Sequence, residues 1–298
     1  MIEAENVSKS YNGLVAIDNI SFNIRQNELY GFIGPDGSGK TTIFRIISTL
    51  LLPDEGKVQV NGFDVVKDYK KIRKIIGYMP GHFSQYPDLS VQENIDFFAT
   101  IFNTSFNEHY HLIKEIYEQL EPFKNRPAGK LSGGMKQKLA LCCALIHKPE
   151  ILILDEPTTG VDAVSRYEFW ILLKKIRSSG ITVIVSTPYM DEASLCDRVA
   201  LIQKGNILKV DIPQNIIASF DDPLFAIVSD NNYRVKKLLF NSELCLNVYL
   251  FGKEIHFIPK HGINDELITT FLQNAGVLNF KLSKINPTIE DYFIKNMV

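Results

Sequence analysis

The chain has 298 residues, of which 45% are apolar and 22% charged, and its formal net charge is -2. This length accommodates one large domain and a second, smaller one. The nearly neutral charge argues against a broad basic surface, so we expect no nucleic-acid partner.

The N-terminal segment (1–13) has no basic stretch followed by an apolar core, so we expect no signal peptide. No window approaches about 18 consecutive apolar residues, so a role at a membrane would depend on a partner. The four cysteines, at positions 142, 143, 196 and 245, fit no metal-binding spacing and are expected to be reduced thiols.

The N-terminal two thirds of the chain alternate between strand patterns and helix patterns. Period-two segments near the N-terminus, such as residues 2–11, predict an antiparallel patch. Further on, the patterns predict strands at 28–34, 151–157 and 181–187, a helix at 40–51, and a hairpin at 198–211 that turns at Gly205–Asn206. Strands separated by helices predict a mostly parallel α/β sheet, whose ligands bind at the carboxyl ends of the strands.

Residues 90–148 read as almost wholly helical. Ser90 and Glu93 have the spacing of a capping box, and residues 107–120 are amphipathic. We therefore predict a helical subdomain between the strands of the sheet.

The sequence Asp221–Asp222–Pro223 indicates a domain boundary. Beyond it, the patterns follow the order βαββαβ of a ferredoxin-like plan, with a hairpin near 251–254. A last helix, at 288–297, is expected to be capped by Thr288. We thus predict two domains, 1–220 and 221–298.

The sequence GPDGSGKTT (34–42) has the G-x-x-x-x-G-K-[ST] spacing of a phosphate-binding loop, between a predicted strand and a predicted helix. Its glycines let backbone N–H groups surround phosphate oxygens, Lys40 reaches the β- and γ-phosphates, and Thr41 offers a hydroxyl to Mg²⁺. The residues expected to bind the phosphates of a nucleotide here are Gly34, Pro35, Asp36, Gly37, Ser38, Gly39, Lys40, Thr41 and Thr42.

Two acids end the apolar strand pattern of residues 151–157. Asp155 is placed to hold Mg²⁺ through water, together with Thr41. Glu156 is placed to orient or deprotonate the attacking water, which makes it the candidate catalytic residue.

A second anion-binding helix end is predicted at LSGGMKQ (131–137). Ser132 can cap a helix whose first turn, Gly133–Gly134, exposes bare backbone N–H groups. Since the chain already has a phosphate loop, this end is expected to serve the nucleotide of another molecule, with Ser132, Gly133, Gly134 and Gln137 as its candidates.

In this order, the motifs resemble those of the ATP-binding subunit of an ABC transporter, over about residues 1–215. The resemblance implies a P-loop NTPase with a RecA-like core, an antiparallel β subdomain and a helical subdomain. It also implies that Tyr11 stacks on adenine and that Asp162, in TTGVD (158–162), lies in the loop that joins two subunits. Two subunits would form a head-to-tail dimer, each ATP lying between one chain's residues 34–42 and the other's residues 131–137.

The segments around residues 78–98 and 186–199 and the ending PTIEDYFI (287–294) resemble bacterial ABC-2 type exporters, including drug-efflux ATPases. This resemblance implies a separate ABC-2 type membrane permease as partner and a location on the inner face of the plasma membrane. The transported substrate, and the choice between a homodimer and a heterodimer, stay open.

Two positions depart from the family pattern. Gly81 stands where a glutamine normally contacts Mg²⁺ and the attacking water, and Pro188 stands where a histidine normally contacts the γ-phosphate. His82 and Gln85 lie in the same loop as Gly81 but are offset from it. We also expect Thr187 to cap a helix with Pro188 in its first turn.

These departures predict a chain that binds ATP and hydrolyses it slowly in its own site. As an alternative, the chain would be a soluble ATP-gated regulatory protein without a membrane partner. Proteins of that kind in this family usually join two cassettes on one chain, whereas this chain has one.

Overall fold

The computed structural model describes residues 1–297, which form two units, Met1–Pro213 and a second that begins at Gln214. The division comes before the boundary expected at residue 221, since Phe220 already belongs to an apolar cluster of the second unit. No helix among residues 1–297 is long and apolar enough to cross a membrane.

A six-stranded sheet forms the centre of the first unit, with the order β10-β9-β3-β8-β7-β6. Its strands are β3 (Leu29–Ile33), β6 (Ile76–Met79), β7 (Ile151–Asp155), β8 (Thr182–Thr187), β9 (Arg198–Gln203) and β10 (Asn206–Asp211). All neighbours pair in parallel except β9 and β10, which form the expected hairpin. The hairpin turns one residue earlier than expected, at Lys204–Gly205, where both residues have positive φ angles.

The register of the parallel strands brings three chain segments to one edge of this sheet. Ile33 pairs with Thr187, and Asp155 pairs with Ser186. The segments that follow β3, β7 and β8 therefore leave the sheet side by side, at the edge where α/β proteins bind ligands.

A second sheet confirms the predicted antiparallel patch, with the order β2-β1-β4-β5. Its strands are β1 (Ile2–Tyr11), β2 (Leu14–Ile24), β4 (Glu55–Val60) and β5 (Phe63–Asp64). The main core lies between the two sheets, where Phe32 has edge-to-face contacts with Phe22 and Phe44 at centroid distances of 5.1 and 5.6 Å. This packing fixes the antiparallel sheet against β3.

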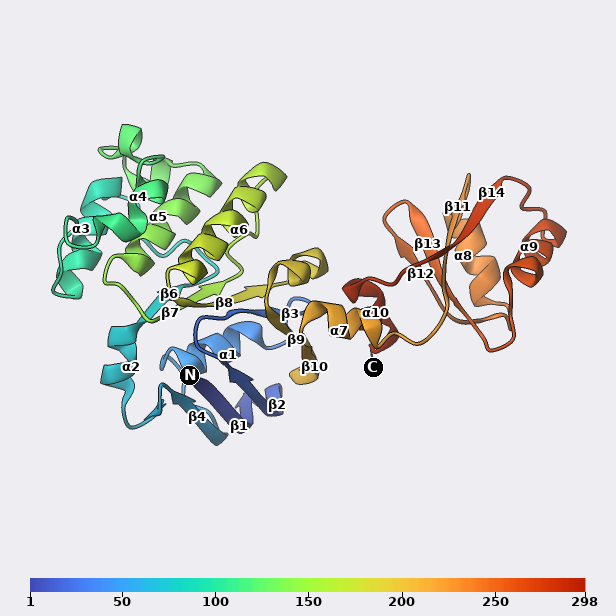
Figure 1. Cartoon of the computed structure of the whole chain (residues 1–298), viewed down its shortest axis with the longest axis horizontal. Helices are drawn as coiled ribbons and strands as arrows, with labels where there is room; N and C mark the ends of the chain where they lie inside the picture. Colours follow the sequence, from blue (N-terminus) through green and yellow to red (C-terminus); the bar gives the residue numbers. More distant parts are fainter. Residues whose placement is uncertain (298) are drawn as a thin grey trace. The chain divides into compact units, whose positions relative to one another are not determined.

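The helices of the first unit are α1 (Lys40–Ile47), α2 (Tyr69–Ile75), α3 (Val91–Ile101), α4 (Tyr110–Tyr117), α5 (Gly133–Leu145) and α6 (Ala163–Ser178). Helices α3, α4 and α5 gather into the predicted helical region, away from the antiparallel sheet (Figure 1). The capping box of Ser90 and Glu93 is confirmed at the start of α3. Helix α1 is shorter than expected, because Thr49 has a φ of 60° and the helix ends before it.

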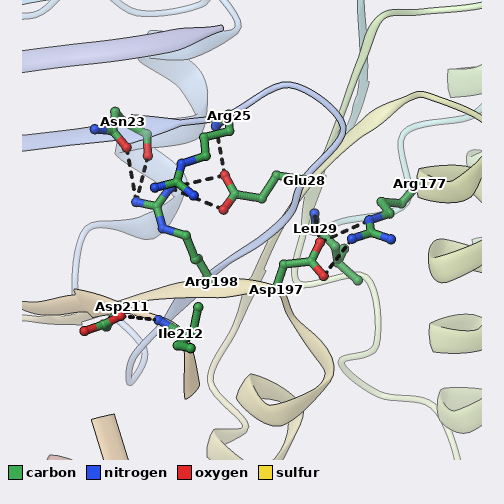
Figure 2. Close-up of polar contacts among 9 residues, drawn as sticks. All are labelled: Asn23, Arg25, Glu28, Leu29, Arg177, Asp197, Arg198, Asp211 and Ile212. Carbon is green, nitrogen blue, oxygen red and sulfur yellow. Dashed lines mark hydrogen bonds and ion pairs between the residues drawn. The ribbon is translucent and has the colours of Figure 1, made fainter. Parts of the chain in front are cut away.

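A buried ion pair joins the antiparallel sheet to the parallel one at the end opposite the candidate site (Figure 2). Arg198 lies 3.2 Å from Glu28, and it also donates to the side-chain oxygen of Asn23 on β2. Beside it, Asp197 accepts hydrogen bonds from the backbone N–H of Leu29 and from Arg177 of α6. These contacts fix the start of β3, and β3 in turn carries the loop that follows it.

The second unit has the predicted order of elements, β11 (Leu224–Ser229), α8 (Asn232–Phe240), β12 (Cys245–Phe251), β13 (Glu254–Pro259), α9 (Asp265–Asn274) and β14 (Phe280–Ile285). Its antiparallel sheet has the order β12-β13-β11-β14. Helix α7 (Pro213–Ala218) precedes it, and α10 (Ile289–Lys295) ends it with the predicted Thr288 cap. Apolar clusters lie on both faces of the sheet, one of them with α8 and α9 and the other with α10.

Candidate nucleotide-binding site

The loop after β3 has the geometry of a phosphate-binding loop. Gly34 has no room for a side chain, because a Cβ atom there would lie 2.1 Å from the carbonyl oxygen of Ile202. Gly37 and Gly39 have φ angles of 76° and 104°, which are strained for other residues. The spacing of the glycines is therefore required by the backbone.

One polar side chain of this loop, that of Ser38, is buried without a partner within residues 1–297. Ser38 is 2% exposed, and its hydroxyl has no hydrogen-bond partner in the described part of the chain. Thr42 is buried, Gly39 and Thr41 are half-buried, and Pro35, Asp36 and Gly37 are exposed. An unpaired hydroxyl inside a ring of backbone N–H groups fits a bound phosphate, since buried polar groups are normally paired.

Lys40 extends across this loop to the second motif. Its ammonium donates to the carbonyl oxygens of Gly34 and Pro35, at 2.7 and 3.0 Å, and lies 3.4 Å from Glu156 Oε1. The side chain is only 3% exposed. The phosphate loop and the candidate catalytic acid thus meet at the carboxyl edge of the sheet, as the sequence predicts.

The two acids at the end of β7 are held by a residue that the sequence did not reveal. The Ser186 hydroxyl donates to Asp155 Oδ1 at 2.6 Å and accepts from the Glu156 N–H at 2.9 Å. Glu156 has a φ of 48°, a conformation that costs energy in a residue other than glycine. Ser186 on β8 pairs with Asp155 on β7. The register of these two strands is therefore the feature from which the role of Ser186 could have been found.

Asp155 and Thr41 are the residues here that could hold Mg²⁺. Asp155 is 2% exposed, and its Oδ1 accepts a hydrogen bond from the Ser186 hydroxyl. A hydroxyl and one carboxylate suit a magnesium ion that also binds phosphate oxygens and water, so these residues fit the ion.

The helix start at residues 131–137 also has the predicted form. Ser132 caps α5, with its hydroxyl accepting from the Met135 N–H at 3.4 Å. Gly133 and Gly134 lie against the segment 160–165, and Asp162 caps α6 by accepting from the N–H groups of Val164 and Ser165. Within residues 1–297, no hydrogen bond or ion pair joins residues 131–137 to residues 34–42.

The two departures, Gly81 and Pro188, occupy the expected edge of the sheet. Gly81 lines a cavity of about 170 Å³ together with His82, Gln137 and Glu156. Gln85 does not line it; its side chain is buried in a different cavity. The structure thus brings His82, but not Gln85, to the cavity that contains the candidate catalytic acid.

Pro188 directly follows β8, and Thr187 accepts a hydrogen bond at its carbonyl oxygen from the N–H of Gly34. The expectation that Thr187 caps a helix is wrong. Its hydroxyl instead accepts from the Tyr189 N–H in a tight turn, and a 3₁₀ helix begins only at Met190, without a side-chain cap. The turn still places residue 188 next to the phosphate loop.

Tyr11 ends β1 with 39% of its side chain exposed. The next strand, β2, approaches the phosphate loop, since a Cβ atom on Gly39 would lie 2.5 Å from the carbonyl oxygen of Ala16. Tyr11 is therefore accessible, and it pairs with Leu14 at the start of the strand that packs against the loop.

Comparison with known proteins agrees with this geometry. A family model described as ABC transporter matches residues 17–159. The Nod factor export ATP-binding protein I of Burkholderia lata is 35% identical over 221 residues, which cover 73% of this chain and 73% of that protein. The chain belongs to the ABC transporter ATPase family.

Another relative of this ABC ATPase has a name that refers to multidrug transport. The probable multidrug ABC transporter ATP-binding protein YbhF of Escherichia coli is 36% identical over 220 residues. That match covers 73% of this chain but only 38% of YbhF, so this chain spans well under half of the length of YbhF. Among solved structures, the ATP-binding cassette MJ0796, as a dimer in a post-hydrolysis state with ADP and Pi, matches with a TM-score of 0.65 and 29% identity, covering 71% of this chain and 98% of that one.

Proposed function

We propose that the chain is the ATP-hydrolysing, energy-coupling subunit of an ABC-2 type export complex. The observation that carries the proposal is the meeting of Lys40, Asp155 and Glu156 at one edge of the sheet, next to the unpaired Ser38 hydroxyl. The names of the relatives, which export Nod factor or are linked to multidrug transport, support export. They do not favour the alternative of a soluble regulatory protein.

In this proposal, each residue has a defined role toward ATP. The loop 34–42 holds the phosphates through backbone N–H groups and Lys40, and Tyr11 stacks on adenine. Thr41 and Asp155 hold Mg²⁺, which would offset negative charge on the phosphates. Glu156 accepts a proton from the attacking water, and Lys40 lies close enough to stabilise its carboxylate.

The second helix end completes the site of another subunit. Ser132, Gly133 and Gly134 are at least partly accessible, and Asp162 lies in the adjoining segment. A head-to-tail dimer, either of two copies or with a different ATPase chain, would place this helix end over the partner's phosphates. The hydrogen bonds from Ser165 lower the pKa of Asp162, which keeps a negative charge beside this surface.

The membrane permease would contact a cavity that includes part of the loop 81–90. The cavity has a volume of about 380 Å³ and an apolar lining that includes Phe98 and Phe102. Three polar atoms that line it are buried without a partner in residues 1–297: Ser48 Oγ, Gln85 Oε1 and His147 Nδ1. An apolar segment of the permease that also carries hydrogen-bonding groups would pair with these three atoms. Bound to the permease in this way, the chain would lie on the inner face of the plasma membrane.

The chain's own hydrolysis is proposed to be slow. Gly81 and Pro188 offer no side-chain donor or acceptor at the two positions where the family contacts the water and the γ-phosphate. The loss of one preorganised contact to a charged transition state commonly lowers the rate by about 10²- to 10³-fold. ATP binding would be largely retained, since the loop that holds the phosphates is intact.

The test measures ATP binding and turnover of the purified full-length chain. We expect tight ATP binding that Lys40→Ala abolishes. We also expect turnover far below that of a family member with a glutamine at the position of Gly81 and a histidine at the position of Pro188. Turnover at ordinary rates, lost in Glu156→Gln, would contradict a degenerate site. Isolation of the complex from its membrane, with a count of its distinct ATPase chains, tests the permease and the dimer.

We further propose that residues 221–298 form a ferredoxin-like domain. The order βαββαβ and the sheet order β12-β13-β11-β14 support this assignment. A truncated chain that ends at Pro213, the last residue of the first unit, should retain ATP binding.

A further inference from the structure

Residues 157–161 connect the candidate catalytic acid Glu156 to Asp162, the cap of α6. In the part of the chain that the structure describes, one side chain of this segment donates a hydrogen bond to a residue beyond it and its two flanking acids. That donor is the hydroxyl of Thr158, which donates to Glu192 Oε2 at 3.2 Å. Thr158 is 1% exposed and Glu192 is 2% exposed, so the segment is anchored by a buried contact.

Glu192 lies close in the chain to the phosphate loop's own support. It belongs to the 3₁₀ helix Met190–Leu195, which follows the turn after β8. At the start of that turn, the carbonyl oxygen of Thr187 accepts a hydrogen bond from the N–H of Gly34. Glu192 therefore joins the segment 157–161 to the turn that supports the phosphate loop.

The carboxylate of Glu192 is buried with only part of its pairing satisfied. Its Oε1 accepts no hydrogen bond within residues 1–297, and the guanidinium of Arg166 on α6 lies 3.8 Å from it at Nε. Arg166 also donates to the exposed Asp191 at 3.4 Å. Apolar residues of similar size often stabilise a core as well as a buried ion pair does. A carboxylate kept here with incomplete pairing therefore points to a role besides stability.

The anchor at Thr158 lies two residues beyond the catalytic acid. Glu156 has a φ of 48°, and such a backbone conformation persists only where the surroundings hold it. Ser186 holds it on one side by accepting from its N–H. On the other side, the hydroxyl of Thr159 donates to Glu156 Oε2 at 3.4 Å. Because Thr159 directly follows the anchored residue, loss of the anchor would loosen this contact to the carboxylate.

We propose that Glu192 is a positioning residue for ATP hydrolysis, which holds Thr158 and thereby the orientation of the Glu156 carboxylate. It acts through Thr158 rather than on the nucleotide. This assignment rests on the proposed function, because it takes Glu156 as the acceptor of the proton of the attacking water. It deepens that function by naming a residue, remote from the phosphate loop in sequence, on which the rate depends.

The first test measures single-turnover hydrolysis by the full-length chain, in excess over radiolabelled ATP. Thr158→Val removes the donor at nearly constant size, and Glu192→Met removes the acceptor. Each should lower the rate about tenfold with little change in ATP affinity, because a displaced catalytic group slows chemistry without weakening phosphate binding. Thr158→Ser keeps a hydroxyl and Glu192→Gln keeps an oxygen acceptor, so both should retain most of the rate.

A double variant separates one shared contact from two independent effects. Thr158→Val with Glu192→Met should be about as slow as either single variant, because both substitutions break the same hydrogen bond. The matched control is Asp191→Asn on the same 3₁₀ helix, which should leave the rate unchanged. Multiplied losses in the double variant, or equal rates in Thr158→Val and Thr158→Ser, would overturn the proposal.

Hydrogen exchange of the nucleotide-free chain provides a measurement that does not depend on hydrolysis. In Glu192→Met, peptides from residues 158–165 should exchange several-fold faster, while peptides from residues 40–47 should not change. Unchanged exchange in 158–165, or faster exchange throughout the first unit, would contradict a local positioning role. A chain that fails to bind ATP would contradict the proposed function, whereas a chain that binds ATP but shows unaltered rates in these variants would contradict the role of Glu192 alone.

Discussion

The backbone of Gly81 packs directly against Asp155. A Cβ atom on Gly81 would lie 3.2 Å from the carbonyl oxygen of Asp155 and 3.9 Å from its carboxyl carbon. A longer side chain at this position would start beside the carboxylate proposed to hold Mg²⁺. A side chain introduced at residue 81 would therefore lie in contact with Asp155 from its first carbon atom.

We predict that Gly81→Gln combined with Pro188→His raises turnover of the purified chain by at least about tenfold, because two polar contacts to the transition state are restored. Steady-state phosphate release measures the change, and nucleotide affinity should alter little. The matched control is Gly81→Ala with Pro188→Ala, which adds Cβ atoms without donors. Equal rates in the two double variants would show that the missing side chains do not limit hydrolysis.

The pair of Glu28 and Arg198 leads to a stability prediction (Figure 2). Glu28 is 6% exposed, so Arg198→Met leaves a buried carboxylate without its cation and should cost about 3–5 kcal/mol. Urea unfolding followed by the fluorescence of Trp170, the chain's single tryptophan, reports on the first unit. The more exposed Arg177, changed to Met, should cost no more than about 1 kcal/mol.

A similar cost for both arginine variants would contradict this assignment, since it would mean that burial does not distinguish the two ion pairs. A Glu28→Gln/Arg198→Met double variant should recover part of the loss, because no unpaired charge is then buried.

The sequence was sufficient to predict the sheet, the phosphate loop and the two acids, because each depends on local spacing. It did not reveal Ser186, whose role arises from the pairing of β7 with β8 across 31 positions of chain. It also placed a helix directly after Thr187, where the hydroxyl instead closes a turn. Contacts between distant segments, and competition between a cap and a turn, are decided by tertiary packing.

The cysteines lead to a prediction about reactivity. Cys142, Cys143 and Cys196 are buried, and burial raises the pKa of each thiol well above its ordinary value. Since the thiolate is the reactive form, these three should stay unmodified in the native chain at pH 8. An aromatic disulfide reagent should modify only the half-buried Cys245, and slowly, and all four after unfolding. Rapid reaction of more than one thiol in the native chain would contradict the burial.

The C-terminal helix α10 is held by a buried carboxylate. Asp291 is 0% exposed and accepts hydrogen bonds from Tyr249, His256 and Thr288. Burial alone would raise the pKa of Asp291, but the hydrogen bonds from His256, Thr288 and Tyr249 outweigh it and lower that pKa below its ordinary 3.8. The motif PTIEDYFI therefore places an acid that ties the last helix to β12 and β13.

The lowered pKa of Asp291 predicts how the stability of the second unit depends on pH. Because the folded-state pKa lies below the unfolded-state value, the contribution is complete above about pH 4 and is lost as the pH falls through the folded-state pKa. Asp291→Asn should remove this dependence and cost about 3 kcal/mol at neutral pH, since His256 and Thr288 lose a charged acceptor. Urea unfolding followed by far-UV circular dichroism measures both the pH dependence and the cost of the substitution. The relevant transition is that of the second unit, which the fluorescence of Trp170 in the first unit does not report. The control is Asp222→Asn, which removes the partly exposed ion pair between Asp222 and Lys295 of α10. It should change the free energy of unfolding by less than about 1 kcal/mol.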